Sequence, residues 1–355
     1  MRRWLTIVCW MLITQWACSS GYGAYLEQGE GVPPRRPTPI RPRPPIRPPI
    51  RPPVRPPVPP NGQQILYARA SDLSVGWPAT HNQMTVYPLK GRDLNFPAIF
   101  SLQQALSRGY IWIEETGQVG SLAAHNRSPH FVFLMLGEIV GGGWQNRTLA
   151  EDTLLGPWAE GVRLPVYCVE KGRWRGGREQ FSSIPEASPP CVRRKVAQGA
   201  TQEEVWSEVD RLSERAGGRS PTHDLSQCLR SAPCYGEIDE TVRAIEGRLP
   251  KGTVGIMVFC GNRLVGIDLF GSQHLFSQLR SELLRSYAWD VFGEHPPWWS
   301  RMGRIGANRL LDRLRRANAT CTGTPGDGCG LDVWGEGLQG HGVALGGSVL
   351  HLHLY

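Results

Sequence analysis

A run of prolines near the start of the chain limits which part of it can fold. From Val32 to Pro60 an Ile/Val-Arg-Pro-Pro unit repeats, with proline at every second or third position. Proline lacks an amide hydrogen and fixes its own backbone angle, so the run cannot form helix or sheet and is expected to be a polyproline II spacer. We therefore expect a leader at residues 1–23, a Pro/Arg-rich linker at 24–64 and a single globular domain at 65–355.

The leader has the layout of an export signal. Two arginines precede an uncharged apolar run from Trp4 to Ala17, and small and polar residues follow. The run is short for a membrane span. Cleavage at Ala17-Cys18 would match a bacterial lipoprotein junction, cleavage near Gly23 would match a soluble export signal, and an uncleaved anchor is a third alternative. A long spacer makes most sense behind a lipid anchor at Cys18, and each alternative with cleavage predicts a location in the periplasm or at the cell surface.

The net positive charge of the chain comes almost entirely from its first 64 residues. Residues 1–64 hold nine arginines against two glutamates, whereas the remaining 291 residues carry thirty basic and twenty-nine acidic groups. The globular part is thus nearly neutral, and we expect no nucleic-acid-binding face. The arginines are expected to solubilise a rigid linker, with contact to the cell wall or to anionic lipid as the alternative.

Seven cysteines follow the linker. In an oxidising compartment pairing is the default, and short spacing suggests partners, although spacing alone does not fix the connectivity. No CxxC motif occurs, so we expect no metal site. The expected disulfides are Cys228–Cys234, Cys321–Cys329 and Cys168–Cys191, which leaves Cys260 as a buried residue of an apolar strand.

Hydrophobic periodicity predicts strands in the first half of the domain and helices later. Alternating or continuous apolar runs indicate strands at 110–115, 131–140 and 162–170. A capping box at Thr201 starts a helix that ends at Gly217. The remaining expected elements are a helix after Ser101, a helix in ETVRAIEGRL, a hairpin over 253–271, helices near 272–292 and Leu310, and a last strand in SVLHLHLY. This order predicts an α+β fold with a mostly antiparallel, sandwich-like β core and helices in the C-terminal half.

Polar residues follow the apolar run in LGEIVGGGWQNR. Glu138 ends the expected strand, three glycines allow a close backbone approach, and donors follow at Gln145, Asn146 and Arg147. A carboxylate beside a buried strand needs a partner. We therefore expect a polar ligand site, with a hairpin loop in which Arg147 pairs with Glu138 as the structural alternative.

The stretch VYCVEKGRW repeats this design. Glu170 ends an alternating strand, and Arg173 and Trp174 follow within a turn. Two such strand ends could line one cleft, with one glutamate protonated and the other ionised, or could be two solvated hairpins. Asp268 and His351 add further titratable groups to the candidate site, although a lone strand histidine is more often simply packed.

A third candidate surface is the segment Pro296-Pro297-Trp298-Trp299. Adjacent tryptophans after two prolines could form an exposed aromatic platform for a sugar or a partner. Packing of a loop against the core is the alternative.

Taken together, GEIVGGGWQNR, CVEKGRW, GNRLVGIDLFG, LLRSYAWDVF and GSVLHLHLY resemble the ARG-and-rhodanese-phosphatase-superfamily-associated protein domain family. The resemblance runs from about Met84 to Tyr355 in the same order. It places the Glu138, Gln145, Asn146, Arg147, Glu170, Arg173 and Trp174 positions on motifs, with Asp268, Ser286, Tyr287 and His351 on weaker ones. Trp144 stands where the resemblance predicts a basic residue. The family name records association with genes similar to ADP-ribosylglycohydrolases and rhodanese-type phosphatases, and implies no activity by itself.

These observations predict an exported, envelope-tethered protein that binds a small polar or anionic ligand or a protein partner. The alternative is a hydrolase of phosphate- or ADP-ribose-like substrates. In that alternative Glu138 and Glu170 act as acid and base, and Arg147 and Arg173 hold the anion. The sequence leaves open whether any reaction occurs.

Overall fold

The structure is a computed structural model that describes residues 61–173 and 180–355. The predicted export signal, most of the predicted linker and Trp174 lie outside the described residues. The fold is α+β, as predicted, with antiparallel sheets and one parallel strand pair. Helix α1 (Gly62–Asp72) begins three residues before the predicted linker boundary, and the Asn61 side chain caps it by accepting the Gln63 amide hydrogen.

The largest sheet in the described part of the chain has nine strands. In spatial order they are β1 (Ser74–Val75), β3 (Met84–Lys90), β13 (Thr253–Cys260), β14 (Arg263–Phe270), β18 (Ser348–Leu354), β17 (Leu338–Leu345), β16 (Cys329–Gly335) and β15 (Asn318–Thr322), with β2 (Ala79–His81) beside β3. Strands β13 and β14 form the predicted hairpin, which turns at Gly261 and Asn262. The sheet therefore joins residues from both ends of the globular part.

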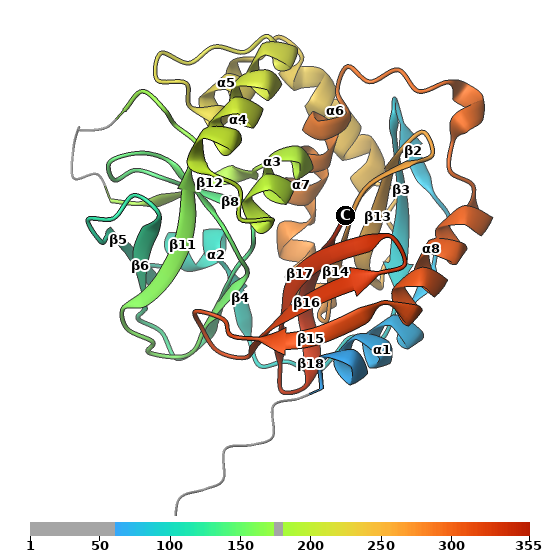
Figure 1. Ribbon diagram of the computed structural model, residues 1–355, viewed down its shortest axis with the longest axis horizontal. Coiled ribbons are helices and arrows are strands. Elements are labelled where there is room, and N and C mark those ends of the chain that lie inside the picture. Colours follow the sequence, from blue (N-terminus) through green and yellow to red (C-terminus); the bar gives the residue numbers. More distant parts are fainter. Residues whose placement is uncertain (1–60, 174–179) are drawn as a thin grey trace, which may run out of the picture. The chain divides into compact units, whose positions relative to one another are not determined.

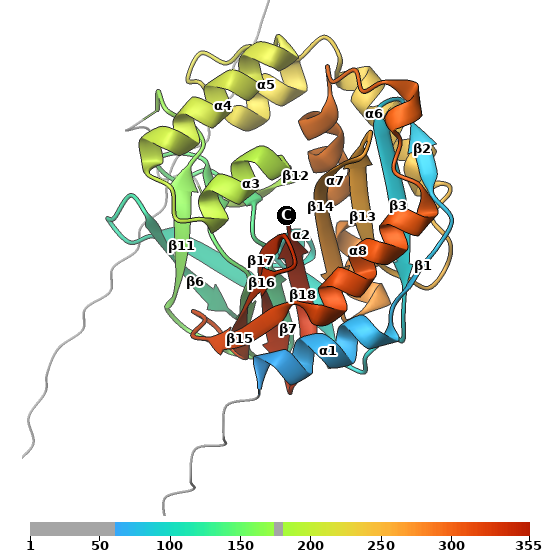
Figure 2. The same cartoon turned by 45° about the vertical axis from the view of Figure 1, so that its right-hand side comes forward.

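Apolar side chains leave this sheet on both faces. On β13, Met257 and Phe259 pack on one side with α1 and α8 (Arg304–Arg316), while Ile256 and Val258 pack on the other. Figure 2 shows α1 and α8 together at one side of the sheet. Burial on both faces explains why β13 is a nearly continuous apolar run. The side chains that matter below lie on the face opposite α1 and α8.

Two smaller sheets form a second core. The six-stranded sheet has the order β12 (Ser182–Ala187), β8 (Glu138–Gly141), β9 (Arg147–Leu149), β11 (Val162–Cys168), β6 (Ser121–Asn126) and β5 (Ile111–Glu115). The three-stranded sheet has the order β10 (Thr153–Leu155), β7 (Phe131–Leu134) and β4 (Ile99–Ser101), with β4 parallel to β7. Their apolar side chains form a cluster of their own. Figure 1 shows these strands in cyan and green, apart from the orange and red strands of the large sheet.

Helices α2 (Leu102–Ser107), α4 (Gln202–Ala216) and α7 (Gln273–Val291) begin and end close to where the sequence predicts. By contrast, α1, α3 (Pro190–Ala197) and α5 (Leu225–Ser231) were not predicted, and α6 (Tyr235–Glu246) begins before the predicted segment. Helix α2 is capped by Ser101, and α4 has the capping box of Thr201 and a left-handed Gly217 at its end. Helix α7 is capped by Ser272. The short helix η1 spans Trp298–Ser300.

The run at 131–140 is not one strand, contrary to the prediction. Strand β7 ends at Leu134, and β8 begins at Glu138 after a turn whose Gly137 has φ +88°. Side chains stabilise the break, because Glu138 Oε2 accepts the Met135 amide hydrogen at 2.6 Å. Glu138 thus starts a strand instead of ending one, and this moves its side chain away from the loop that follows.

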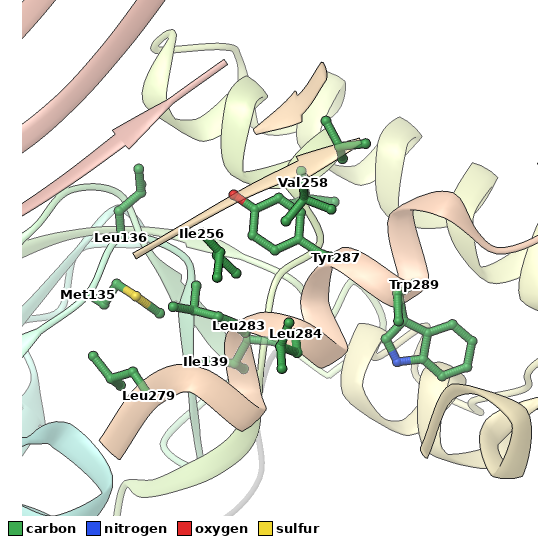
Figure 3. Close-up of a cluster of buried hydrophobic side chains, with 14 of the residues drawn as sticks. Met135, Leu136, Ile139, Ile256, Val258, Leu279, Leu283, Leu284, Tyr287 and Trp289 are labelled. Atoms are coloured by element: carbon green, nitrogen blue, oxygen red, sulfur yellow. The ribbon is translucent and has the colours of Figure 1, made fainter. Parts of the chain in front are cut away.

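Helix α7 connects the two cores. Figure 3 shows its Leu279, Leu283 and Tyr287 beside Ile256 of β13 and Met135 of the turn after β7. These side chains are all fully buried or nearly so. Since burying each such side chain contributes about 1.5–3 kcal/mol, this contact fixes the large sheet against the smaller ones.

The cysteines are separate thiols in the structure. Of the expected pairs only Cys321 and Cys329 are adjacent, with their Sγ atoms 3.0 Å apart. The Cys168 thiol instead donates to Gln145 Oε1 at 3.0 Å, and the Cys234 thiol donates to the Ala216 carbonyl. Burial raises the pKa of Cys260, which lies in β13 as expected.

No helix among the described residues is long and apolar enough to cross a membrane. The same residues contain no group of three or more His, Cys, Asp or Glu side chains that could hold a metal ion.

Candidate functional site

Strand alternation places three titratable residues on one face of the large sheet. On β18, Leu352 and Leu354 pack on the side of α1 and α8, so His351 and His353 point to the opposite face. Strand β14 pairs with β18 so that Asp268 lies opposite His353. The register therefore brings two histidines and a carboxylate together in the interior.

Asp268 is the centre of a fully buried polar network. Its two oxygens accept hydrogen bonds from the two terminal nitrogens of Arg193 at 3.1 and 2.8 Å. The Tyr287 hydroxyl donates a further hydrogen bond to Asp268 at 2.6 Å. His351 Nε2 and His353 Nδ1 each lie 3.1 Å from Asp268 Oδ1. Burial by itself raises the pKa of Asp268, but Arg193 and the histidines outweigh it and hold the pKa well below 3.8.

Arg193 reaches this carboxylate from α3 through space that a glycine leaves open. A Cβ atom at Gly137 would lie 2.5 Å from Arg193 Cγ. The arginine is completely buried, and its Nε has no hydrogen-bond partner in the described structure. The turn before β8 therefore needs a glycine at position 137, because the Arg193 side chain from α3 packs directly against it.

His351 links the network to a second carboxylate. Its Nδ1 lies 2.6 Å from Asp152 Oδ2, and Asp152 Oδ1 accepts the Leu136 amide hydrogen at 2.8 Å. Burial lowers the pKa of His351, but Asp152 and Asp268 on its two sides raise it to about 9. The neighbouring His353 has a pKa of about 4, because burial and Arg193 oppose its protonation. At neutral pH the first imidazole is thus charged and the second is neutral.

Glu138 lies beside this network, with its carboxyl group in the core. Burial raises its pKa well above 4.5, and the nearby Glu282 raises it further. Burial also raises the pKa of Glu282 to about 8, with Glu186 adding to the shift. One oxygen of Glu138 and one of Glu282 have no hydrogen-bond partner in the described structure. Glu138 is therefore an interior carboxyl group whose surroundings favour its neutral form.

An open pocket of about 620 Å³ reaches Asp152 from the surface. Its walls come from β11, from the end of α3 and start of α4, and from β16, β17 and the turn after β15. Three carboxyl groups and one imidazole line it: Glu151, Asp152, Asp332 and His341. His341 Nδ1 lies 2.9 Å from Asp332 Oδ1, and burial, with Asp152 and Asp332 nearby, raises the pKa of Glu151. The pocket is therefore acidic, with one imidazole.

Glu170 belongs to another cluster. Its carboxylate binds Arg173 Nε at 2.9 and 3.0 Å, the Asn146 amide at 3.0 Å and the Thr222 hydroxyl at 2.7 Å. Burial raises the pKa of Glu170, but these donors lower it below 4.5 overall. Gln145 Nε2 donates to the Glu170 carbonyl at 2.8 Å. The motif residues Gln145, Asn146, Glu170 and Arg173 thus contact one another, as the sequence suggests.

Glu138 and Glu170 are held by separate sets of partners in the described structure. Glu138 contacts the turn before it and approaches Glu282, whereas Glu170 is bonded to Arg173 and Thr222. Arg147 does not pair with Glu138 either. It is fully buried, and its Nε donates to the Val119 carbonyl at 3.2 Å, while its terminal nitrogens have no partner among the described residues.

Sequence reasoning therefore found some members of the central network and missed others. Asp268 and His351 were candidates and are in contact, and Tyr287 was a weaker one. Arg193 and Asp152 were missed. The only sequence signal for His353 was the alternation in SVLHLHLY, which puts it on the same face as His351. No local pattern marks Arg193, which reaches Asp268 from 75 residues away.

The fold and the site define an α+β protein with a buried ion network beside an open acidic pocket. A family model matches residues 72–355, and the chain belongs to this family, the ARG and Rhodanese-Phosphatase-superfamily-associated Protein domain. The match covers the large sheet, both smaller sheets and the whole network. No curated protein and no solved structure matches the chain.

Proposed function

We propose that the protein binds a small polar ligand in the pocket that reaches Asp152. The observation that carries this proposal is the gathering of Glu151, Asp152, Asp332 and His341 around a volume of about 620 Å³. Ligand sites are typically concave, mostly apolar in lining, and fitted with a few convergent polar groups. Pockets of 300–1,000 Å³ are typical for small molecules, so the volume suits a ligand of that class.

The charges of the pocket narrow the chemistry of its ligand. Carboxylates accept hydrogen bonds and attract cations, and the charge of Asp152 is balanced by protonated His351. Glu151 and Asp332 remain to contact the ligand, together with His341. This arrangement favours a ligand that presents hydroxyl or ammonium groups. Of the two ligand classes predicted from the sequence, it therefore supports a polar ligand and does not support an anionic one.

The floor of the pocket is held rigidly. Asp152 is fixed by His351 on one oxygen and by the Leu136 amide on the other, and His351 is fixed in turn by Asp268. A pre-ordered site loses less conformational entropy when its ligand binds. The buried network thus acts as a support for the pocket.

Hydrolysis is the second candidate, and one observation favours it. Glu151 has a raised pKa and lies near Asp332, so two carboxyl groups with different environments face the same pocket. Such a difference is what separates a general acid from a general base. In this candidate Glu151 and Asp332 take the roles that the sequence suggested for Glu138 and Glu170.

We further propose that the protein acts outside the cytoplasm, tethered to the envelope. This proposal is supported by the apolar leader, by Cys18 and by the Pro/Arg repeat in the sequence. A spacer of this kind would extend ~3.1 Å per residue. It would place the pocket away from the point of attachment.

A thermal-shift screen of the full chain tests the ligand proposal. Amino sugars, neutral oligosaccharides, polyamines, nucleotides, ADP-ribose and sugar phosphates form the panel. A ligand at a hundred times its Kd adds about 2.7 kcal/mol to stability. We expect a hit among the hydroxyl- or ammonium-bearing compounds that Asp332→Asn abolishes and that Asp312→Asn, on the exposed part of α8, leaves unchanged.

The outcomes separate the candidates. A hit that persists in Asp332→Asn contradicts the pocket as the binding site. A hit that is consumed over time, with turnover lost in Glu151→Gln, favours the hydrolase. If only phosphate-bearing compounds shift the melting temperature, the predicted ligand class is wrong.

A further inference from the structure

The segment around η1 exposes large apolar side chains that the pocket does not use. Trp298, Trp299 and Ile305 are 79%, 72% and 73% exposed, and Trp77, in the turn between β1 and β2, is 76% exposed. Single exposed apolar residues are common, but four on one edge need a reason. We call this edge the Trp/Arg face, defined by Trp77, Trp298, Trp299, Arg301, Arg304 and Ile305.

Two sets of contacts hold the segments of the Trp/Arg face in place. The Arg304 guanidinium lies 4.6 Å from the Trp77 ring and donates to the Val75 carbonyl, which joins the β1 edge to the start of α8. Met302 lies between η1 and α8, and its amide donates a hydrogen bond to the Gly261 carbonyl at 2.8 Å. The Met302 carbonyl accepts a hydrogen bond from the Tyr87 hydroxyl at 2.8 Å. Figure 2 shows α8, β1 and β2 on the same side of the domain.

Charge on this face is mainly positive. Arg301 and Arg304 of this face are exposed, as is the neighbouring Arg309, one helical turn after Ile305 on α8, and within the described residues neither Arg301 nor Arg309 forms an ion pair. Asp312 on α8 is paired with Arg315 at 2.8 Å, and Glu294, before η1, is paired with Arg215 and Arg263. A pocket of about 280 Å³ beside Trp298 and Arg301 also contains His295 and Glu237.

We propose that the Trp/Arg face docks on an anionic lipid surface. Tryptophan rings prefer the boundary between headgroups and acyl chains, and arginines are attracted to acidic headgroups. A flat glycan is less suited to this face, because the Trp298 and Trp299 rings are nearly perpendicular, at 85°, and Ile305 offers no hydrogen bond. The arginines of the linker carry the same sign and add to the attraction.

Vesicle co-sedimentation of the full chain tests the proposal, with phosphatidylglycerol/phosphatidylcholine vesicles as the probe. The variant Trp298→Ser/Trp299→Ser/Ile305→Ser is compared with Trp158→Ser, which removes a tryptophan that is 63% exposed in the loop between β10 and β11. The linker is present in every variant, so its own attraction to lipid cancels in the comparison. High salt weakens the electrostatic attraction of the linker to lipid, whereas insertion of apolar side chains into the bilayer does not depend on it.

We expect the triple variant to lose tenfold or more in vesicle partitioning at high salt and Trp158→Ser to match the native chain. Arg301→Gln/Arg309→Gln should weaken binding to anionic vesicles and leave binding to pure phosphatidylcholine unchanged. Equal partitioning of the triple variant and the native chain would overturn the proposal. Loss of native binding to insoluble polysaccharide in the triple variant, without any vesicle binding, would overturn it in favour of a glycan surface. Circular dichroism melts check that all variants are folded.

Discussion

Arg193 and Asp268 form a two-point ion pair in which neither side chain is exposed to solvent. The pair joins α3 to the centre of the large sheet, and through Asp268 it also holds Tyr287 and His351. Desolvation makes such a pair expensive to form, but removing one partner leaves a buried charge without compensation. The pair is therefore a point at which a single substitution should affect the whole fold.

Asp268→Asn should lower the free energy of unfolding by about 3–5 kcal/mol, because Arg193 then remains buried without its counter-charge. Chemical denaturation of the two proteins measures the difference. Glu336→Gln, which breaks an exposed pair with Arg316, is the control and should cost no more than about 1 kcal/mol. Equal effects of the two substitutions would contradict the structural role of the buried pair.

Gly137→Ala should destabilise the protein more than Gly346→Ala. Both glycines have positive φ, +88° and +58°, so each substitution carries backbone strain of about 1–2 kcal/mol. At Gly137 the new Cβ would also meet Arg193 at 2.5 Å, whereas nothing lies within 4 Å of the Cβ position at Gly346. We expect the excess cost at Gly137 to be about 1–3 kcal/mol, from overpacking. Thermal melts that coincide for the two variants would rule out this tight fit.

Stability should fall as pH rises from about 6.5 to 9, whereas between pH 4.5 and 6.5 the loss from Glu282 is offset by His353, whose folded pKa of about 4 lies below its ordinary 6.5. Glu282 has a folded pKa of about 8, above its ordinary 4.5, so its stabilising contribution is complete below pH 4.5 and is lost by pH 8. His351, raised from 6.5 to about 9, loses its contribution between those two values. Glu282→Gln should therefore remove the Glu282 loss, so that between pH 6.5 and 8 the unfolding free energy of the variant falls less steeply than that of the native chain. The exposed Glu203→Gln should leave it unchanged, and a profile of Glu282→Gln that follows the native one would disprove the assignment.

Mild oxidation should link Cys321 to Cys329. Their Sγ atoms are 3.0 Å apart, and a disulfide requires about 2.05 Å, so a small rotation suffices. Closing a loop of this length should add about 2.5 kcal/mol to stability. Peptide mapping by mass spectrometry without reductant detects the link. Cys321→Ser should abolish both the link and the gain in stability, whereas Cys260→Ser should retain them; a different pair in the map would contradict the prediction.

Local patterns in the sequence predicted the fold class and several of the elements. The capping box of Thr201, the cap at Ser101, the helix that starts near Ser272 and the hairpin at Gly261 all depend on neighbouring residues, and the structure confirms each of them. The same patterns failed at residues 131–140. There the break depends on the Glu138 side chain and on Asp152, which accepts the Leu136 amide from 16 residues away.

The candidate site was predicted only in part because its contacts are distant along the chain. The neighbours Asn146, Glu170 and Arg173 come together as their motifs suggest. By contrast, Asp152 meets His351 across 199 residues. That contact depends on how the loop before β10 packs against β18, which a single sequence does not reveal.

The central claim is tested most directly by isothermal titration calorimetry with the best ligand from the screen. The ligand is titrated into the native chain, into Glu151→Gln and into Glu160→Gln. Glu151 lines the pocket, whereas Glu160 is exposed and does not. If the pocket is the binding site, Glu151→Gln should weaken the Kd at least tenfold, which corresponds to about 1.4 kcal/mol, and Glu160→Gln should leave it unchanged. A Kd that is the same in all three proteins would contradict the assignment of this pocket.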